Sequence, residues 1–398
     1  MPLVNMKDML AHAYDYGYAV GAYDLVSLDF LEAIIQGAEN CHAPVVLNLA
    51  ESHFEYFDFE LAMAATVAAA RRARVPVAIH LDHGMSLDSA VRAIRYGCNG
   101  VMVDACLHSF EENVARTRAV ADMAHACGVP AEGKLRLVAG VEGEDAEKHP
   151  GAVIYTSVEE TQTYVQRTGV DFLALSIGTV HGRMRSTPKL DFKRLARING
   201  SLGIPLVIHG GTGLSNEQYK SLITRGVAKI NYYTALSDIA GAHILRNSVC
   251  DPASGYTGLV RGVRLVIQAE VERTIHLFGS AGRAEAVLAH ARPWREVEHL
   301  IIYNAHGGTP TEIQQIATHG RELLAAIPGV RRVDTGRALK ADAKYHYCWL
   351  VRFANAAVID SYRDHPDHRA FADQEFRPVA SDRVSVDYEL TDQVTDSN

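Results

Sequence analysis

Short apolar runs alternate with amphipathic stretches along the first 240 residues of the chain. The runs have the length of β-strands, and the stretches between them have the pattern of helices, which is typical of βα units and a parallel sheet. The strands that we expect are Ala19–Tyr23, Val45–Leu49, Val77–Leu81, Gly100–Val103, Val129–Gly133, Phe172–Ser176, Leu206–His209 and Ala228–Asn231. Eight such units are the number that closes a (β/α)8 TIM barrel.

The pattern changes near Arg292, and the order of elements from there predicts a ferredoxin-like α+β domain of the βαββαβ type. The elements that we expect are strand Val297–Asn304, helix Thr311–Ile327, strands Val330–Leu339 and Tyr345–Phe353, helix Asn355–Asp364 with a continuation from His368, and strand Val384–Glu389. We therefore expect an α/β barrel domain at residues 1–285 and a small second domain at residues 294–391.

Composition narrows the class of protein. The 398 residues are 48% hydrophobic and 22% charged, as in an ordinary globular protein, and the formal net charge of −8 disfavours a nucleic-acid partner. No apolar run is long enough to span a membrane, and the N-terminus lacks a signal-peptide pattern. The six cysteines form no CxxC pair, so we expect reduced thiols and a cytoplasmic location.

Three histidines, His83, His181 and His209, each stand near the carboxyl end of an expected strand. Side chains at those ends converge on one mouth of a barrel. Three imidazole ligands with an open fourth position are typical of catalytic Zn²⁺, and Asp82 would lie beside the ion as an acid-base group. A single histidine at such a place is usually an ordinary polar residue. Three at corresponding positions favour a metal site.

Other polar residues follow the same strand ends, and glycine-rich turns accompany them. Asp104, Glu132 and Asn231 belong to this set. The turn His209–Gly213 follows the seventh expected strand, and its backbone N–H groups could bind phosphate, although a plain tight turn is the alternative. The polar segment 135–156 carries several acidic residues and is long enough for a functional lid.

The chain resembles the zinc-dependent class II ketose-bisphosphate aldolases, in particular the fructose- and tagatose-bisphosphate branch. The matching stretches are GYAVGAYD, VPVAIHLDHG, GVMVDA followed by FEENV, Gly140-Val141-Glu142, RTGVDFLALSIGTVHG, TPKLDF, LVIHGGTG, GVAKIN and LFGSAGRA. They cover roughly residues 1–285. The resemblance implies a homo-oligomeric barrel, a dimer or tetramer, and an aldehyde-lyase that acts on a sugar or sugar phosphate.

The resemblance also implies roles for individual residues. Zn²⁺ would be bound by His83, His181 and His209. Another divalent cation is the alternative, and a monovalent cation could bind in addition. Asp82 would be the acid-base residue, and Glu142 the acid of a mobile loop that handles the proton at the nucleophilic carbon. The matching contacts to dihydroxyacetone phosphate are Gly182, Gly210, Gly211, Thr212, Asn231 and Thr234.

Several positions depart from the family's pattern. Lys134 stands where the family has a second glutamate, which together with Asp104 can bind the metal in an alternative position. We expect the ammonium to pair with Asp104 or Glu132 instead. The family's asparagine after the first strand is Asp24, and Tyr233 replaces a smaller residue. Near the phosphate, Arg183 and Arg185 stand in place of a lysine. An aldol substrate without phosphate is therefore an alternative.

The C-terminal part resembles the stress-responsive dimeric α/β-barrel (Dabb) domain. The matching stretches are EHLIIYNAHGGTPTEI, IPGVRRVDTGR, YHYCWLVRFAN, YRDHPDHRAFADQEFRPV and VSVDYEL. In that family two modules pair their sheets, so the domain is expected to dimerise the enzyme. A second metal site is suggested by His299, His306, His346, His365 and His368, but the two histidines of HPDH are interpreted as helix-start and packing residues. A third hypothesis is a catalytically inactive barrel whose appended module carries the function.

Overall fold

A computed structural model describes residues 2–136, 138, 155–183, 188–306 and 308–391. The chain separates into two compact units. The second begins at Trp294 and also includes the segments Val91–Gly97 and Met123–Val129. No helix within the described ranges is long and apolar enough to cross a membrane.

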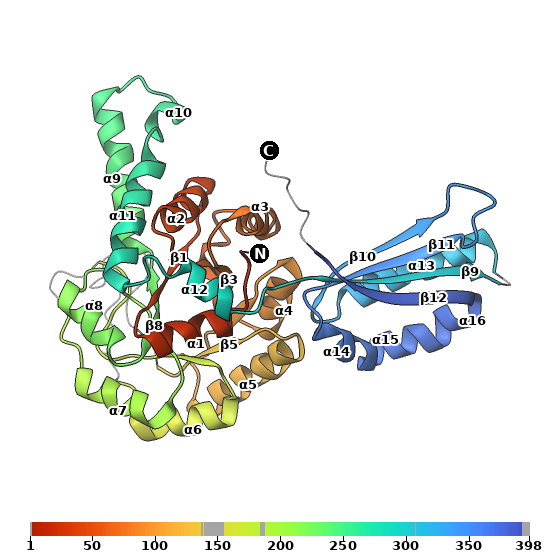
Figure 1. Ribbon diagram of the computed structural model, residues 1–398, viewed down its shortest axis with the longest axis horizontal. Coiled ribbons are helices and arrows are strands. Elements are labelled where there is room, and N and C mark those ends of the chain that lie inside the picture. Colours follow the sequence, from red (N-terminus) through yellow and green to blue (C-terminus); the bar gives the residue numbers. More distant parts are fainter. Residues whose placement is uncertain (1, 137, 139–154, 184–187, 307, 392–398) are drawn as a thin grey trace. The chain divides into compact units, whose positions relative to one another are not determined.

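The first unit is a closed parallel barrel in which each strand pairs with the next and the last pairs with the first (Figure 1). The strands are β1 Val20–Asp24, β2 Val45–Ala50, β3 Val77–Gly84, β4 Gly100–Val103, β5 Ala131–Lys134, β6 Phe172–Ala174, β7 Leu206–Ile208 and β8 Val227–Tyr232. The TIM-barrel prediction is confirmed, with strand limits that differ by up to three residues.

Helices follow the strands around the outside of the barrel (Figure 1). They are α1 Met6–Tyr16, α2 Leu28–Asn40, α3 Phe59–Arg72, α4 Leu87–Tyr96, α5 Phe110–Ala126, α6 Val158–Thr168, α7 Phe192–Leu202, α8 Asn216–Ile223, α9 Thr234–Cys250, α10 Tyr256–Leu259, α11 Val263–Phe278 and α12 Ala284–His290, with the short 3₁₀ helix η1 Glu51–His53. Figure 1 shows α9 and α11 side by side, extending beyond the barrel.

Local sequence explains where these helices begin and end. Asn5, Ser27 and Asp58 each accept a backbone N–H of the first turn with their side chains, which satisfies donors that a helix leaves unpaired. Gly17 and Gly169 end helices with left-handed backbone, which glycine adopts without steric cost. One apolar core forms where α1 packs against residues of the barrel strands. It includes Val4, Met6, Met9, Leu10, Tyr18, Val46, Phe172 and Val207.

The second unit is a four-stranded antiparallel sheet in the order β10-β11-β9-β12. Its strands are β9 Val297–Ala305, β10 Val330–Arg337, β11 Tyr347–Phe353 and β12 Ala380–Glu389. Its helices are α13 Pro310–Ala325, α14 Val358–Asp364, α15 Pro366–Phe371 and α16 Arg377–Val379, with the short π-helix η3 Ala372–Phe376. The chain order is βαββαβ, so the ferredoxin-like prediction is confirmed.

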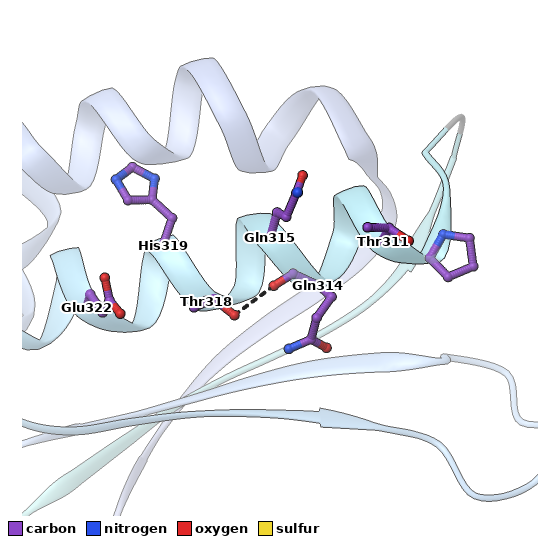
Figure 2. Close-up of a pocket in the computed structure, with 7 residues that line it drawn as sticks. Thr311, Gln314, Gln315, Thr318, His319 and Glu322 are labelled. Carbon is purple, nitrogen blue, oxygen red and sulfur yellow. Dashed lines mark hydrogen bonds between the residues drawn. The ribbon is translucent and has the colours of Figure 1, made fainter.

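One face of this sheet packs on helices through aromatic residues. Trp349, Val351 and Phe353 alternate along β11 as buried residues, and the Trp349 ring lies 5.6 Å from that of Phe371 between centroids. His365 accepts the backbone N–H of Asp367 and caps α15, the helix-start role expected for it. The outer side of α13 carries a shallow depression lined by Pro310, Thr311, Gln314, Gln315, Thr318, His319 and Glu322 (Figure 2).

Candidate active site

Asp82 and His83 are consecutive, yet both reach the same cluster of side chains at the end of β3. In a regular strand they would point to opposite faces. Here the pairing of β3 with β4 shifts register between Leu81 and Gly84, and His83 has a φ of 49°, a left-handed value that a non-glycine residue rarely adopts. This β-bulge re-aims the imidazole, so a carboxylate and an imidazole lie next to each other at the barrel mouth.

The structure brings together the three histidines that the sequence singled out. His83 ends β3, His181 lies in the loop after β6, and His209 directly follows β7. One ring nitrogen from each lies within 4.8 Å of the others. Among the described residues, the two groupings able to hold a metal ion both lie in this barrel, the second being Asp82, Glu132 and His209.

A hydrogen bond orients each imidazole through its other nitrogen. Nδ1 of His83 lies 2.7 Å from Oδ2 of Asp104, and Nε2 of His209 lies 2.9 Å from Oε1 of Glu132. Nδ1 of His181 lies 3.1 Å from the carbonyl oxygen of Val138. These acceptors require N–H donors, which fixes the tautomers. When the three rings are neutral, their lone pairs therefore stand on Nε2 of His83, Nε2 of His181 and Nδ1 of His209. Such outer hydrogen bonds are usual for metal-binding histidines.

The distance between two of those nitrogens tests whether a metal ion fits. Nε2 of His83 and Nδ1 of His209 are 3.1 Å apart, so either one of them donates a proton to the other or a cation lies beside both. A divalent cation would bind the lone pairs of two neutral rings at this separation. In a tetrahedral zinc site, nitrogens at ~2.0–2.1 Å from the ion stand about 3.4 Å apart. The donors and their spacing thus fit a divalent ion that prefers imidazole.

A buried ion pair lies next to His209. Nζ of Lys229 donates to Oε2 of Glu132 at 2.9 Å, and both side chains are fully buried. Burial raises the pKa of Glu132, but Lys229 and the hydrogen bond from His209 lower it to about 2. Glu132 is therefore an anion that can accept the His209 proton. Burial and the neighbouring Lys229 also lower the pKa of His80 to about 3, so this buried imidazole is neutral.

Asp82 is held by two amides. Its Oδ2 accepts hydrogen bonds from Nδ2 of Asn231 at 2.7 Å and from Nδ2 of Asn48 at 3.4 Å, while Oδ1 has no hydrogen-bond partner among the described residues. Burial raises the pKa of Asp82, but His83, His209 and Lys229 lower it well below its usual range. The carboxylate is ionised, with one oxygen fixed and the other able to accept a proton from a substrate.

Lys134 pairs with Asp104, one of the two partners expected from the sequence. Nζ of Lys134 lies 2.7 Å from Oδ2 of Asp104. Glu132 instead pairs with Lys229, which the sequence interpretation missed together with His80. Both were open to prediction, because each is an ionisable residue inside an apolar strand, and such residues are rarely buried without a role.

The glycine turns bring three loops into close contact. Gly210 has a φ of 66°, and a Cβ there would lie 2.2 Å from the carbonyl oxygen of Val180. A Cβ on Gly211 would lie 2.8 Å from the carbonyl oxygen of Asn231. Thr212 accepts the N–H of Ala235 in the first turn of α9 at 3.3 Å. The loops after β6, β7 and β8 therefore meet, with the amino end of α9 among them.

The remaining expected residues have varied surroundings. Gly182, with a φ of 85°, and Thr234, the first residue of α9, belong to this group of loops. The Tyr233 ring lies 4.7 Å from that of His53 between centroids. Arg183 donates from Nε to Asp238 at 2.8 Å. Asp24 is fully buried at the end of β1. Glu142 and Arg185 lie outside the described residues.

Fold and site together define a barrel enzyme whose polar groups gather at the carboxyl ends of its strands. The family model for fructose-bisphosphate aldolase class II matches residues 4–283, and that for the stress responsive A/B barrel domain matches residues 297–390. The chain belongs to the class II fructose-bisphosphate aldolase family and carries a C-terminal Dabb domain.

Relatives and solved structures agree with that assignment. The chain is 40% identical over 289 residues to a probable fructose-bisphosphate aldolase of Bacillus subtilis, covering 71% of this chain and 100% of that protein. The crystal structure of the YdjI aldolase of Escherichia coli K12 matches with 32% identity and a TM-score of 0.63, covering 71% and 99%. A putative fructose-1,6-bisphosphate aldolase of Coccidioides immitis matches with 30% identity and a TM-score of 0.65, covering 71% and 98%.

Proposed function

We propose that this protein is a zinc-dependent aldehyde-lyase that reversibly cleaves a ketose phosphate or bisphosphate into a dihydroxyacetone-phosphate-type nucleophile and an aldehyde. The observation that carries the proposal is the convergence of one ring nitrogen from each of His83, His181 and His209 within 4.8 Å, next to the ionised Asp82. His83, His181 and His209 would hold the ion. A bound divalent ion supplies Lewis-acid stabilisation of the negative charge that develops on the nucleophilic half of the substrate.

Asp82 is the proposed acid-base residue. In cleavage its free Oδ1 takes the proton of the C4 hydroxyl, the C3–C4 bond breaks, and the aldehyde leaves. In synthesis the same carboxyl group returns the proton to the aldehyde oxygen. Asn231 and Asn48 keep Oδ2 engaged, which orients the carboxylate throughout. We assign the proton exchange at C3 to Glu142, on the basis of the resemblance alone.

The phosphate of the nucleophile is proposed to bind where the three loops meet. Gly182, Gly210, Gly211, Thr212, Asn231 and Thr234 would supply the contacts. The glycines lack a Cβ that would keep the three loops apart, and the amino end of α9 favours an anion. The side chain of Arg183 is partly exposed in the loop after β6 and could add a guanidinium.

One observation supports a second candidate substrate. The Tyr233 ring packs against His53, next to Thr234, where its bulk would narrow the space for a phosphate. An unphosphorylated carbonyl compound would then be the aldol substrate of the same metal site. Turnover of fructose bisphosphate, tagatose bisphosphate, free dihydroxyacetone and pyruvate, measured side by side, separates these candidates. An inactive barrel would turn over none of them.

The metal mechanism is tested by metal analysis and rate together. We expect about one zinc per chain, loss of turnover with chelator, recovery with zinc, and no inactivation by borohydride in the presence of substrate. His209→Ala should lose both metal and turnover, whereas His108→Ala, at an exposed residue of the loop before α5, should keep both. Wild-type turnover in His209→Ala, or trapping by borohydride, contradicts the proposal.

We also propose that the C-terminal unit makes the enzyme a homodimer or part of a tetramer. On the sheet face opposite the helices, Leu300 stands between Leu350 and Val386, and Ile302 stands between Cys348 and Val384. These side chains are half-buried or exposed. The same face of a second copy would cover them and remove apolar surface from water.

We further propose a cytoplasmic location, which six free cysteines support.

A further inference from the structure

Helices α1 and α12 of the barrel unit pack against each other (Figure 1), and their side chains form a pocket of about 290 Å³. The pocket is lined by His12, Tyr16, Arg283, Ala286, Ala289 and His290. The ring of Tyr18, which contacts His12, comes just before β1, so the pocket lies near the amino ends of the strands. The candidate active site lies at the carboxyl ends of the strands, so this pocket is distinct from it.

His12 is a buried member of this pocket, with only 3% of the residue exposed. Its Nδ1 lies 2.8 Å from the hydroxyl oxygen of Tyr18. Burial raises the pKa of Tyr18, so the hydroxyl keeps its proton, and Nδ1 of His12 is the acceptor within its reach. The neutral ring then carries its own hydrogen on Nε2, which has no hydrogen-bond partner among the described residues. Enclosed donors are normally paired with the protein or with a bound group.

Arg283 and His290 also lack an acceptor. The guanidinium carbon of Arg283 lies 5.4 Å from the ring centroid of Tyr18, and the group makes no ion pair or hydrogen bond with any residue that the structure describes. The ring of His290 lies 5.3 Å from that of His12 between centroids and has no hydrogen bond within the described ranges either.

The charges around the pocket favour an anion. No carboxylate is among the lining residues that the structure describes. Burial lowers the pKa of His12, and the charges of His290 and Arg283 lower it further, whereas Asp15 outside the pocket acts in the opposite direction. The cationic groups that face the pocket therefore repel one another, and an anion between them would remove that repulsion.

We propose that this pocket binds a phosphate group, either as inorganic phosphate or as part of a small phosphorylated metabolite. The Arg283 guanidinium, Nε2 of His12 and the ring of His290 would donate to its oxygens, and arginine can do so through two parallel hydrogen bonds. The ring of Tyr16, stacked on His12 with centroids 4.3 Å apart, closes one side. Three donor side chains suit the several oxygens of a phosphate better than the two of a carboxylate, and the guanidinium excludes a metal cation. This inference does not depend on the proposed aldolase function.

The test is calorimetric titration of the full chain with inorganic phosphate and, separately, with glycerol 3-phosphate. Both are added up to about 10 mM, which exceeds a dissociation constant of ~1 mM. Because the proposed active site would also bind phosphate, the comparison between variants carries the result. Arg283→Gln should lose one bound phosphate per chain or bind it about 10- to 100-fold more weakly than the wild type. Arg197→Gln, at an exposed arginine of α7, is the matched control and should bind like the wild type.

A second variant and a second anion complete the test. His290→Gln changes an exposed residue and should weaken the same binding event about tenfold, so it decides the question if Arg283→Gln does not fold. Tighter binding of glycerol 3-phosphate than of inorganic phosphate supports the site with a phosphorylated metabolite as its ligand, and the reverse order supports it with the free ion. Titration curves of both variants that match those of the wild type and the control overturn the proposal. Acetate that binds as tightly as phosphate overturns it as well.

Discussion

Asn231 donates from Nδ2 to Oδ2 of Asp82 at 2.7 Å, a contact that joins the end of β8 to the end of β3 across the barrel mouth. The amide leaves Oδ1 of the carboxylate without a partner among the described residues. One oxygen of Asp82 is thus held in place, and the other is left for the proton transfer that we propose. This division would let a fully buried carboxylate be both fixed and reactive.

Asp82→Asn should separate proton transfer from metal binding. The amide cannot accept the substrate proton, so turnover should fall about 10²- to 10⁴-fold. None of the three histidine nitrogens that face the ion is altered, so metal content should stay near that of the wild type. Turnover and elemental analysis check both expectations, with the exposed Asp122→Asn as control. Turnover within threefold of the wild type would exclude Asp82 as the acid-base residue.

Gly210→Ala should both destabilise the barrel and reduce turnover. The control is Gly169→Ala, where the φ is 72° and no atom lies within 4 Å of the new Cβ. It should lower the free energy of unfolding by roughly 1–2 kcal/mol through backbone strain alone. Gly210 has a similar φ, but its new Cβ would collide with the carbonyl oxygen of Val180. We therefore expect Gly210→Ala to cost about 2 kcal/mol more than the control in urea unfolding. Equal costs would show that the loops after β6 and β7 are not in close contact.

The stability of the metal-free protein should fall on acidification from pH 6.5. The folded pKa of His80 is about 3, against about 6.5 in an unfolded chain. Between these values the unfolded state binds a proton that the folded state does not, so stability decreases as the pH falls. His80 should contribute about 1.4 kcal/mol per pH unit. The free energy of unfolding, measured in urea at several pH values, should depend less steeply on pH for His80→Gln than for the wild type. The same pH dependence in both proteins would contradict a neutral buried His80.

Charge on the open sheet face of the C-terminal unit should break the proposed dimer. Ile302→Arg places a guanidinium in the centre of that face, where dimerisation would bury it without a partner. Sedimentation analysis should show a smaller assembly than the wild type: a monomer in place of a dimer, or a dimer in place of a tetramer. Leu339→Arg, at a fully exposed residue beyond β10, is the control and should leave the assembly unchanged. An Ile302→Arg protein that assembles like the control would remove this face from the interface.

Sequence patterning predicted the barrel because each strand is a run of buried apolar residues between helices. The limits were less accurate where pairing extends into polar residues. β5 ends on Lys134 rather than Gly133, because its backbone pairs with Ala174 despite the charged side chain. β12 begins at Ala380 rather than Val384, because the polar stretch before Val384 pairs its backbone with β9. Backbone pairing does not depend on apolar side chains, so the pattern does not show it.

The sequence predicted which residues come together at the site but not how they are arranged there. His83, His181 and His209 stand near strand ends, and the barrel alone brings strand ends together. The spacing of residues could not show that His209 offers Nδ1 while His83 offers Nε2, because that choice depends on Glu132 and Asp104. Nor could it show that Lys229 is the partner of Glu132, since the two residues are 97 positions apart in the chain.

The irregularity in β3 matters to anyone who would transplant this chemistry. The adjacent Asp82 and His83 serve one site only because of the shifted pairing between Leu81 and Gly84 and the left-handed backbone at His83. Copying the dipeptide onto a straight strand of another scaffold would send one of the two side chains to the wrong face. A successful graft would have to import the distorted backbone along with the residues.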